Sequence, residues 1–221
     1  MKRLLSVLMM ALLVVQASPK AGASDDSGTA SGGFEIASES ASVQRHGFEE
    51  NEPQVWRKGG NLPNGYSYDI DPAFARSGNR SFKFASQNPS SDAANNIWIT
   101  NNLIGNMPNF IVEGNREYKI TFWYYARGYK KMNPTVGAYL YVRSYNGSQG
   151  IGTDTRFYIP EGDTGEWKRY TVRYTTKEGA NRLQINLGIR AIMGEIWVDD
   201  IAVAPVDPNE ANDLSSLRVE V

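Results

Sequence analysis

Apolar and polar residues alternate with a period of two along most of the chain after residue 46. Successive side chains of a strand point to opposite faces of a sheet, so this alternation predicts β-strands with one apolar face. Clusters of Gly, Pro, Asn and Asp separate the alternating segments and are typical of turns. The clearest segments are 79–86, 95–100, 116–128, 136–145, 166–176, 181–190 and 194–205, and weaker ones are 65–70 and 155–159.

Roughly nine or ten short strands without sustained helical periodicity predict an all-β fold, either a sandwich or a barrel. The segment 103–114 contains apolar residues, but Pro108 and Gly114 favour a loop there.

Three of the segments assign residues to the two faces of a sheet, because the aliphatic face belongs in the core. The inward set is Tyr118, Ile120, Phe122, Tyr124, Ala126, Val136, Ala138, Leu140, Val142, Leu183, Ile185, Leu187 and Ile189. The outward set includes Trp123, Tyr125, Arg127, Tyr139, Tyr141, Arg143, Gln184, Asn186 and Arg190.

The N-terminus has the layout of a secretory signal peptide. Lys2 and Arg3 precede an apolar stretch at 4–15, and small residues follow at 21–23. The apolar stretch is shorter than the roughly 20 residues that span a bilayer. We predict a signal peptide at 1–23, cleavage after Ala23, and a secreted mature protein with no membrane span.

Composition divides the remainder of the chain into three parts. Residues 24–43 are rich in Ser, Gly, Ala and acidic residues, which predicts a linker. Residues 44–206 contain all the alternating segments and are predicted to form one sandwich domain. The polar tail 207–221 is interpreted as a linker or as the start of a further domain.

Charge and residue types exclude several classes of chemistry. Without its predicted signal peptide the chain has 20 basic and 24 acidic residues, a net charge of −4, which disfavours nucleic acid as a partner. The absence of Cys excludes disulfides, Cys nucleophiles and Cys zinc sites, and the single His46 excludes a multi-His metal site. No nucleophile elbow or phosphate-binding loop motif occurs.

Six features in a fixed order carry a resemblance to a known family. They are HGFEEN (46–51), Trp56, SGNRSFKF (77–84), EGNREYKITFWYYARG (113–128), EWKRYTVRYTT (166–176) and GEIWVDDIAVAP (194–205). Together they resemble the carbohydrate-binding modules of families 4, 9 and 22 over residues 44–206. The resemblance implies a two-sheet antiparallel jelly-roll β-sandwich of the galactose-binding-like type.

The same resemblance implies a non-catalytic module that binds a plant-type polysaccharide, either xylan or a β-glucan. Such modules are often attached to xylanases, and DLSSLR (213–218) resembles the segment that leads into a family 10 xylanase domain. We therefore expect a catalytic glycoside hydrolase, such as an endo-1,4-β-xylanase, as a partner domain that this sequence does not contain.

The outward aromatic residues form the candidate binding face. The family topology implies that the strands carrying Trp123 and Tyr125 lie beside those carrying Tyr139 and Tyr141, with Trp98 near them. Sugar rings offer apolar C–H faces and hydroxyl rims, so a sugar site needs flat aromatic rings bordered by polar groups. Arg143, Gln184, Asn186 and Arg190 supply that border. The alternative is that these aromatic side chains serve only cross-strand packing.

A metal site is the second candidate. Counting back from Ile201 and Val203 places Asp199 on the core-facing side of its strand, where a carboxylate needs a partner. The resemblance implies that Asp199 and Glu49, of the Phe48–Glu49 pair, help to bind a structural Ca²⁺, with Asp200 and Glu50 as alternatives one residue away. Otherwise, Asp199 accepts hydrogen bonds from the N–H groups of a turn.

Two other functions remain open. Paired carboxylates in the loops would suit a small secreted glycoside hydrolase or polysaccharide lyase on a jelly roll, or a truncated xylanase. A cell-surface adhesion module would use the same aromatic patch for a protein partner. The outward arginines also suit an acidic sugar, such as a glucuronate branch, against the alternative that they are simply solvated.

Overall fold

A computed structural model of the chain describes residues 43–51, 55–104, 107–108 and 110–207. All of them belong to one compact unit, 39–221. The predicted signal peptide at 1–23, most of the linker at 24–43 and the tail after Asp207 lie outside the described residues, so these assignments stay predictions. Within the described part of the chain, no helix is long and apolar enough to cross a membrane.

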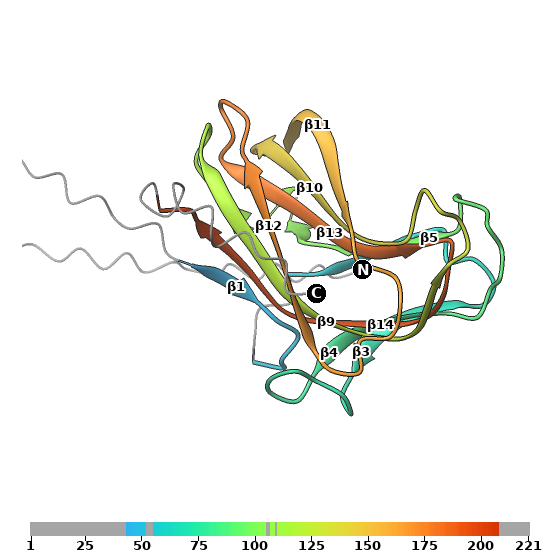
Figure 1. The fold of residues 1–221 in the computed structure, drawn as a ribbon. Coiled ribbons are helices and arrows are strands. Elements are labelled where there is room, and N and C mark those ends of the chain that lie inside the picture. The colour runs from blue at the N-terminus through green and yellow to red at the C-terminus, as the bar shows by residue number, and fades with distance from the viewer. Residues whose placement is uncertain (1–42, 52–54, 105–106, 109, 208–221) are drawn as a thin grey trace, which may run out of the picture. The chain divides into compact units, whose positions relative to one another are not determined.

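Two six-stranded antiparallel sheets form the fold and lie as separate layers (Figure 1). Sheet A has the order β12 (Lys168–Thr175), β9 (Glu117–Lys131), β14 (Ile192–Pro205), β4 (Ser81–Ser86) and β3 (Tyr66–Asp71), and β1 (Gln44–His46) also pairs with β14. Sheet B has the order β11 (Gln149–Tyr158), β10 (Ala138–Asn146), β13 (Arg182–Arg190), β5 (Asn96–Thr100) and β2 (Arg57–Gly60), and β8 (Phe110–Ile111) also pairs with β13. The predicted two-sheet antiparallel jelly-roll sandwich is confirmed.

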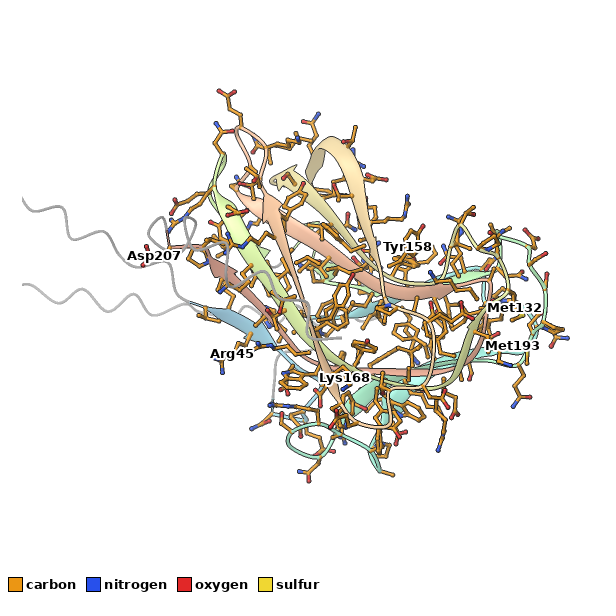
Figure 2. The ribbon with its side chains drawn as sticks, viewed as in Figure 1. Arg45, Met132, Tyr158, Lys168, Met193 and Asp207 are labelled. Atoms are coloured by element: carbon orange, nitrogen blue, oxygen red, sulfur yellow. The ribbon has the colours of Figure 1, made fainter. Side chains whose placement is uncertain are left out.

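The core lies between the two sheets, where side chains fill the space (Figure 2). The residues predicted to face inward on the segments 116–127, 136–143 and 182–190 are all buried. All of them except Val136 belong to one contiguous apolar cluster. The two-residue period was therefore a sound guide to the inner face of each of these strands, because side-chain direction alternates strictly wherever the ladder is regular.

Several strands were not predicted. β6 (Asn102–Ile104), β7 (Met107–Pro108) and β8 lie within 102–111, most of which was expected to be a loop. β1, β2 and the first half of β11 were also missed. β2 contains Gly59 and Gly60, and β11 begins with a Gly-rich polar sequence, so neither has a strong strand propensity. These strands are held by pairing with β5 and β10, which depends on the tertiary structure.

The prediction that Trp123 and Tyr125 lie beside Tyr139 and Tyr141 is wrong. β9 carries the first two residues and pairs with β12 and β14 in sheet A, whereas β10 carries the other two and pairs with β11 and β13 in sheet B. The outward faces of the two sheets point away from each other. The expected single patch is therefore divided between opposite sides of the sandwich.

The prediction that Asp199 faces the core is also wrong. Ile196 and Val198 are core residues, and so are Ile201 and Val203, so the inward positions change parity between 198 and 201. The ladder with β9 is irregular between Asp199 and Ala202, and Asp200 has a φ of 51°. One extra residue in a strand produces this change. Asp199 consequently lies on the outer side of sheet A.

Candidate functional site

The outward positions of sheet B bring together seven of the nine predicted binding residues, and we call this surface the sheet-B face. It carries Trp98, Tyr139, Tyr141, Arg143, Gln184, Asn186 and Arg190, and also Arg57, Gly59, Asn96, Thr100, Arg156 and Tyr158. Two rows of neighbours cross it. One row runs Tyr158, Tyr139, Gly188, Trp98, Gly59, and the next runs Arg156, Tyr141, Asn186, Thr100, Arg57.

The ring of Trp98 lies against the backbone of the neighbouring strand β2. A Cβ atom at Gly59 would lie 2.6, 2.7 and 3.1 Å from Nε1, Cε2 and Cζ2 of Trp98, so the indole rests on the backbone of the neighbouring strand. Trp98 is only partly buried. Because one side of the ring covers Gly59, the opposite side is the one that a ligand can reach.

Tyr139 and Tyr141 point to the sheet-B face but are largely covered, with exposed fractions of 5% and 8%. The Tyr139 hydroxyl donates to Asn96 Oδ1 (3.0 Å) and the Tyr141 hydroxyl donates to Asp154 Oδ1 (3.0 Å). Burial raises the pKa of both phenols to about 12. These rings form a covered layer beneath the surface, and they leave little ring surface on which a sugar could stack.

Charged side chains gather around Tyr141. The Asp154 carboxylate lies 3.5 Å from Arg143 Nη1 and 3.9 Å from Arg156 Nη2. The Arg156 guanidinium lies 5.4 Å from the centre of the Tyr141 ring. Arg143 rests on Gly150, where a Cβ atom would come 2.7 Å from its Cζ. Glycines at both edges of the sheet therefore allow a flat group, Trp98 or Arg143, to lie against the backbone.

Two buried polar atoms of this face have no hydrogen-bond partner among the described residues. They are Nε of Arg143 on β10 and Oδ1 of Asn186 on β13. Unpaired buried donors and acceptors are rare in folded proteins, and both atoms lie beneath the surface of this face. The sheet-B face thus combines the partly exposed ring of Trp98 with polar side chains on the neighbouring strands.

Trp123 and Tyr125 have structural partners on the outer side of sheet A. The Arg76 guanidinium lies 4.2 Å from the centre of a Trp123 ring. Tyr125 belongs to a cluster with Phe74, Trp167 and Trp197, whose ring centroids lie 4.9 to 6.0 Å from its own. Phe74 and Arg76 come from the loop between β3 and β4, which therefore packs over these two predicted binding residues.

Sequence reasoning missed the contributions of the edge strands to the sheet-B face. Gly59 and Arg57 come from β2, and Asp154, Arg156 and Tyr158 come from β11 (Tyr158 is labelled in Figure 2). The weak 155–159 alternation was the only signal for this part of β11. No local pattern indicates that Gly59 accommodates a ring from residue 98, because that relation depends on strand pairing.

The two predicted metal ligands meet at one loop. Glu49 Oε1 accepts the N–H groups of Asn79 (3.0 Å) and Arg80 (2.9 Å). Asp199 Oδ2 accepts those of Arg76 (2.9 Å) and Ser77 (3.3 Å). The alternative interpretation of Asp199, as an acceptor for turn N–H groups, is thus observed.

The chemistry of this donor set still suits a hard cation. Asp199 is 2% exposed and has no ion-pair partner within the described residues. Burial raises its pKa to about 6, and the neighbouring Asp200 carboxylate adds to this shift. A buried carboxylate without a cation favours a bound metal, and carboxylate oxygens are calcium ligands. In the described residues, however, no three His, Asp or Glu side chains cluster, so backbone carbonyls would have to complete the shell.

No protein-family model and no curated protein matches the chain. Among solved structures, it is similar to the enzymatically active domain of tailspike protein 4 of bacteriophage CBA120, with 15% identity and a TM-score of 0.51. The match covers 69% of this chain and 20% of the tailspike chain. At this identity the likeness shows a shared fold.

Two further similar structures contain a module of family 22, one of the three families that the sequence resembles. One is the CBM22-1 xylan-binding domain of Paenibacillus barcinonensis Xyn10C, with 16% identity, a TM-score of 0.42 and coverage of 74% of this chain and 94% of that one. The other is the CBM22-1–GH10 part of Clostridium thermocellum xylanase 10B, with 15% identity, a TM-score of 0.45 and coverage of 69% and 26%. The chain thus spans only a fifth of the tailspike and a quarter of the xylanase.

Proposed function

We propose that this protein is a secreted, non-catalytic module that binds a polysaccharide, xylan or a β-glucan, on the sheet-B face. The packing of the Trp98 ring against Gly59 is the main observation that supports the proposal, because this contact holds an aromatic ring flat against the sheet. Polar side chains of Asn96, Thr100 and Asn186 on this and the next strand border the ring and can hydrogen-bond sugar hydroxyls.

Binding without cleavage is supported by the acidic residues of the face. Glycoside hydrolysis needs two carboxyl groups placed on either side of the scissile bond. Asp154 is the single acidic residue on the strands of sheet B, as far as the structure describes them, and it already contacts Arg143 and Arg156. The sheet-B face therefore lacks the pair of carboxylates that a hydrolase would require there.

The expected affinity is modest. Covering about 100 Å² of apolar ring surface contributes about 2–3 kcal/mol, and ordering of the ligand offsets part of this. Tyr139 and Tyr141 are largely covered, so of the five predicted aromatic residues only Trp98 is both on the sheet-B face and more than 8% exposed. Dissociation constants for short oligosaccharides should lie toward the millimolar end of the range from about micromolar to millimolar.

Affinity electrophoresis in gels that contain soluble xylan or mixed-linkage β-glucan tests the proposal. Retardation of the mature protein is expected, and Trp98→Ala should abolish it. Trp123→Ala is the matched control, since it removes an indole from the opposite sheet and should retain binding. Retardation that survives Trp98→Ala and disappears with Trp123→Ala would place the site on sheet A and overturn the assignment.

A structural Ca²⁺ held by Glu49 and Asp199 belongs to the same proposal. Both carboxylates contact the loop 76–80, and a cation there would neutralise the buried Asp199 and attach this loop to β14. An ion that binds only the folded state must raise its stability, by about 2.7 kcal/mol at a hundred times Kd. Equal thermal midpoints in calcium and in chelator would remove calcium from the proposal.

Export and the partner domain rest on the sequence alone. The signal peptide at 1–23 predicts secretion, and the resemblance of 213–218 to a xylanase-leading segment predicts a catalytic partner. N-terminal sequencing of protein recovered from the medium checks the first prediction, because a secreted product should begin at Ser24.

A further inference from the structure

The strands of sheet B differ from those of sheet A in charge. As described, sheet B carries one acidic residue, Asp154, against six basic ones: Arg57, Lys58, Arg143, Arg156, Arg182 and Arg190. In sheet A three basic side chains have acidic partners on neighbouring strands, Lys83 and Arg127 with Glu195, and Arg173 with Glu117. In sheet B, Lys58 is paired with Asp69 of β3 at 2.9 Å. The whole chain has a net charge of −1, so the positive charge of sheet B is a local property.

Two of these arginines, Arg143 and Arg156, lie beside the single carboxylate of the strands, Asp154. Asp154 contacts both Arg143 and Arg156, at 3.5 and 3.9 Å, and also accepts the Tyr141 hydroxyl. Both arginine side chains are partly exposed, with exposed fractions of 32% for Arg143 and 43% for Arg156. One carboxylate shared between two guanidiniums leaves an excess of N–H donors and of positive charge at this end of the face.

We infer that the ligand is an acidic polysaccharide whose uronate carboxylates bind beside Arg143 and Arg156, and this inference rests on the proposed function. Every basic residue at an outward position of these strands is Arg, whose planar fork matches a carboxylate better than Lys does. The side chains of Arg143 and Arg156 are partly exposed, so their outer N–H groups can donate to a carboxylate at the surface.

The spacing of the groups favours a chain over a single sugar. Trp98 and Arg143 are offset by two strand spacings, with β13 between their strands, and by four residues along β10, counted from Tyr139. With about 4.8 Å between strands and about 3.3 Å per residue, their Cα atoms lie about 16 Å apart. A ligand that contacts both must extend over several sugar rings, stacked at Trp98 and charged at Arg143.

The test compares glucuronate-substituted xylan with the same polymer after chemical reduction of its carboxyl groups, in affinity gels with the mature protein. The acidic polymer should bind at least about tenfold more tightly, as expected for a charge-assisted hydrogen bond. Added salt should weaken that preference, because exposed charges are screened. Arg156→Gln should remove the preference, so that the acidic and the reduced polymer retard the variant to the same degree. Arg169→Gln, which removes one Arg from the outward side of β12 in sheet A, is the matched control and should change nothing.

The possible outcomes separate the two proposals. Equal binding of the acidic and reduced polymers would overturn the inference and leave the proposed function intact. Binding of neither polymer, or of both but unchanged by Trp98→Ala, would contradict the proposed function itself. A sulfated derivative of the reduced polymer that binds as tightly as the glucuronate form would show recognition of any anion and would overturn the assignment to a carboxylate.

Discussion

The indole of Trp98 lies on Gly59, and a Cβ atom at residue 59 would come 2.6 Å from its Nε1. The two residues are directly paired across β5 and β2 although they are 39 positions apart in the sequence. A flat aromatic ring at the surface of a sheet needs such a neighbour without a side chain. The glycine thus contributes to the candidate site without contacting a ligand.

Gly59→Ala is expected to weaken glycan binding while preserving the fold. Gly59 does not have a positive φ, so alanine fits the backbone, and the three nearest atoms all belong to the movable Trp98 ring. Affinity gels should show reduced retardation at an almost unchanged thermal midpoint. The double variant with Trp98→Ala should bind like Trp98→Ala alone, since the two changes act on one ring. An additive loss would contradict this mechanism.

Asn101→Ala should destabilise the protein by about 2–4 kcal/mol, the cost of leaving two buried backbone groups unpaired. Asn101 is fully buried, its Nδ2 donates to Leu183 O (2.9 Å), and its Oδ1 accepts from Ile185 N (2.7 Å). The side chain thus extends the pairing of β13 beyond the end of β5. Urea unfolding measures the loss. Asn64→Ala, at an exposed turn, is the control and should change stability by less than about 0.5 kcal/mol.

Asp200→Val should cost about 1–2 kcal/mol, because Asp200 has a φ of 51° and a β-branched residue is strained in that region. Asp200→Asn should cost less, since asparagine tolerates this conformation. Comparison of the two unfolding midpoints separates backbone strain from the loss of the ion pair with Arg76, which both variants remove. Equal losses would mean that the irregularity does not depend on the backbone preference of residue 200.

Stability should fall as the pH rises above 10, in part because of Tyr129. This residue is 1% exposed, and burial raises its pKa to about 12. The unfolded chain loses the phenol proton near pH 10 whereas the folded protein retains it until about pH 12, so the contribution is complete below pH 10 and is lost between the two values. Between pH 10 and pH 12, the free energy of unfolding should fall by about 1.4 kcal/mol per pH unit for one such tyrosine.

Tyr129→Phe provides the check on this assignment. Between pH 9 and 11, the urea midpoint of this variant should fall less steeply with pH than that of the wild-type protein. It should also be less stable at neutral pH, because the Tyr129 hydroxyl accepts the Ala138 N–H at 2.9 Å. An unchanged alkaline slope would show that Tyr129 ionises at the same pH in both states.

The inner faces of the long strands could be predicted because they follow from one local rule. Leu183, Ile185, Leu187 and Ile189 alternate with polar residues, and burial of that apolar face is favourable whichever strands become neighbours. Asp199 shows where the rule fails. The irregularity at residue 200 changes which positions of β14 face inward. Counting back from Ile201 to Asp199 passes over this irregularity, and no feature of the sequence indicates it.

The candidate site was predictable in part. Seven of the nine proposed residues share the sheet-B face, because they come from β5, β10 and β13, which are neighbours. Trp123 and Tyr125 did not join them, and Gly59 and Arg156 were missed. In each case the deciding fact is which strand lies beside which, and residue types do not encode that relation locally.

The sequence by itself determined the all-β class, the inward face of each long strand and the expectation of export, because these depend on periodicity, composition and a terminal segment. Only the tertiary structure decided that β9 and β10 belong to different sheets, that Trp98 rests on Gly59, and that one carboxylate serves two arginines. The physical reason is that strand pairing is made by hydrogen bonds between distant backbone segments, so it emerges when all the strands are packed together.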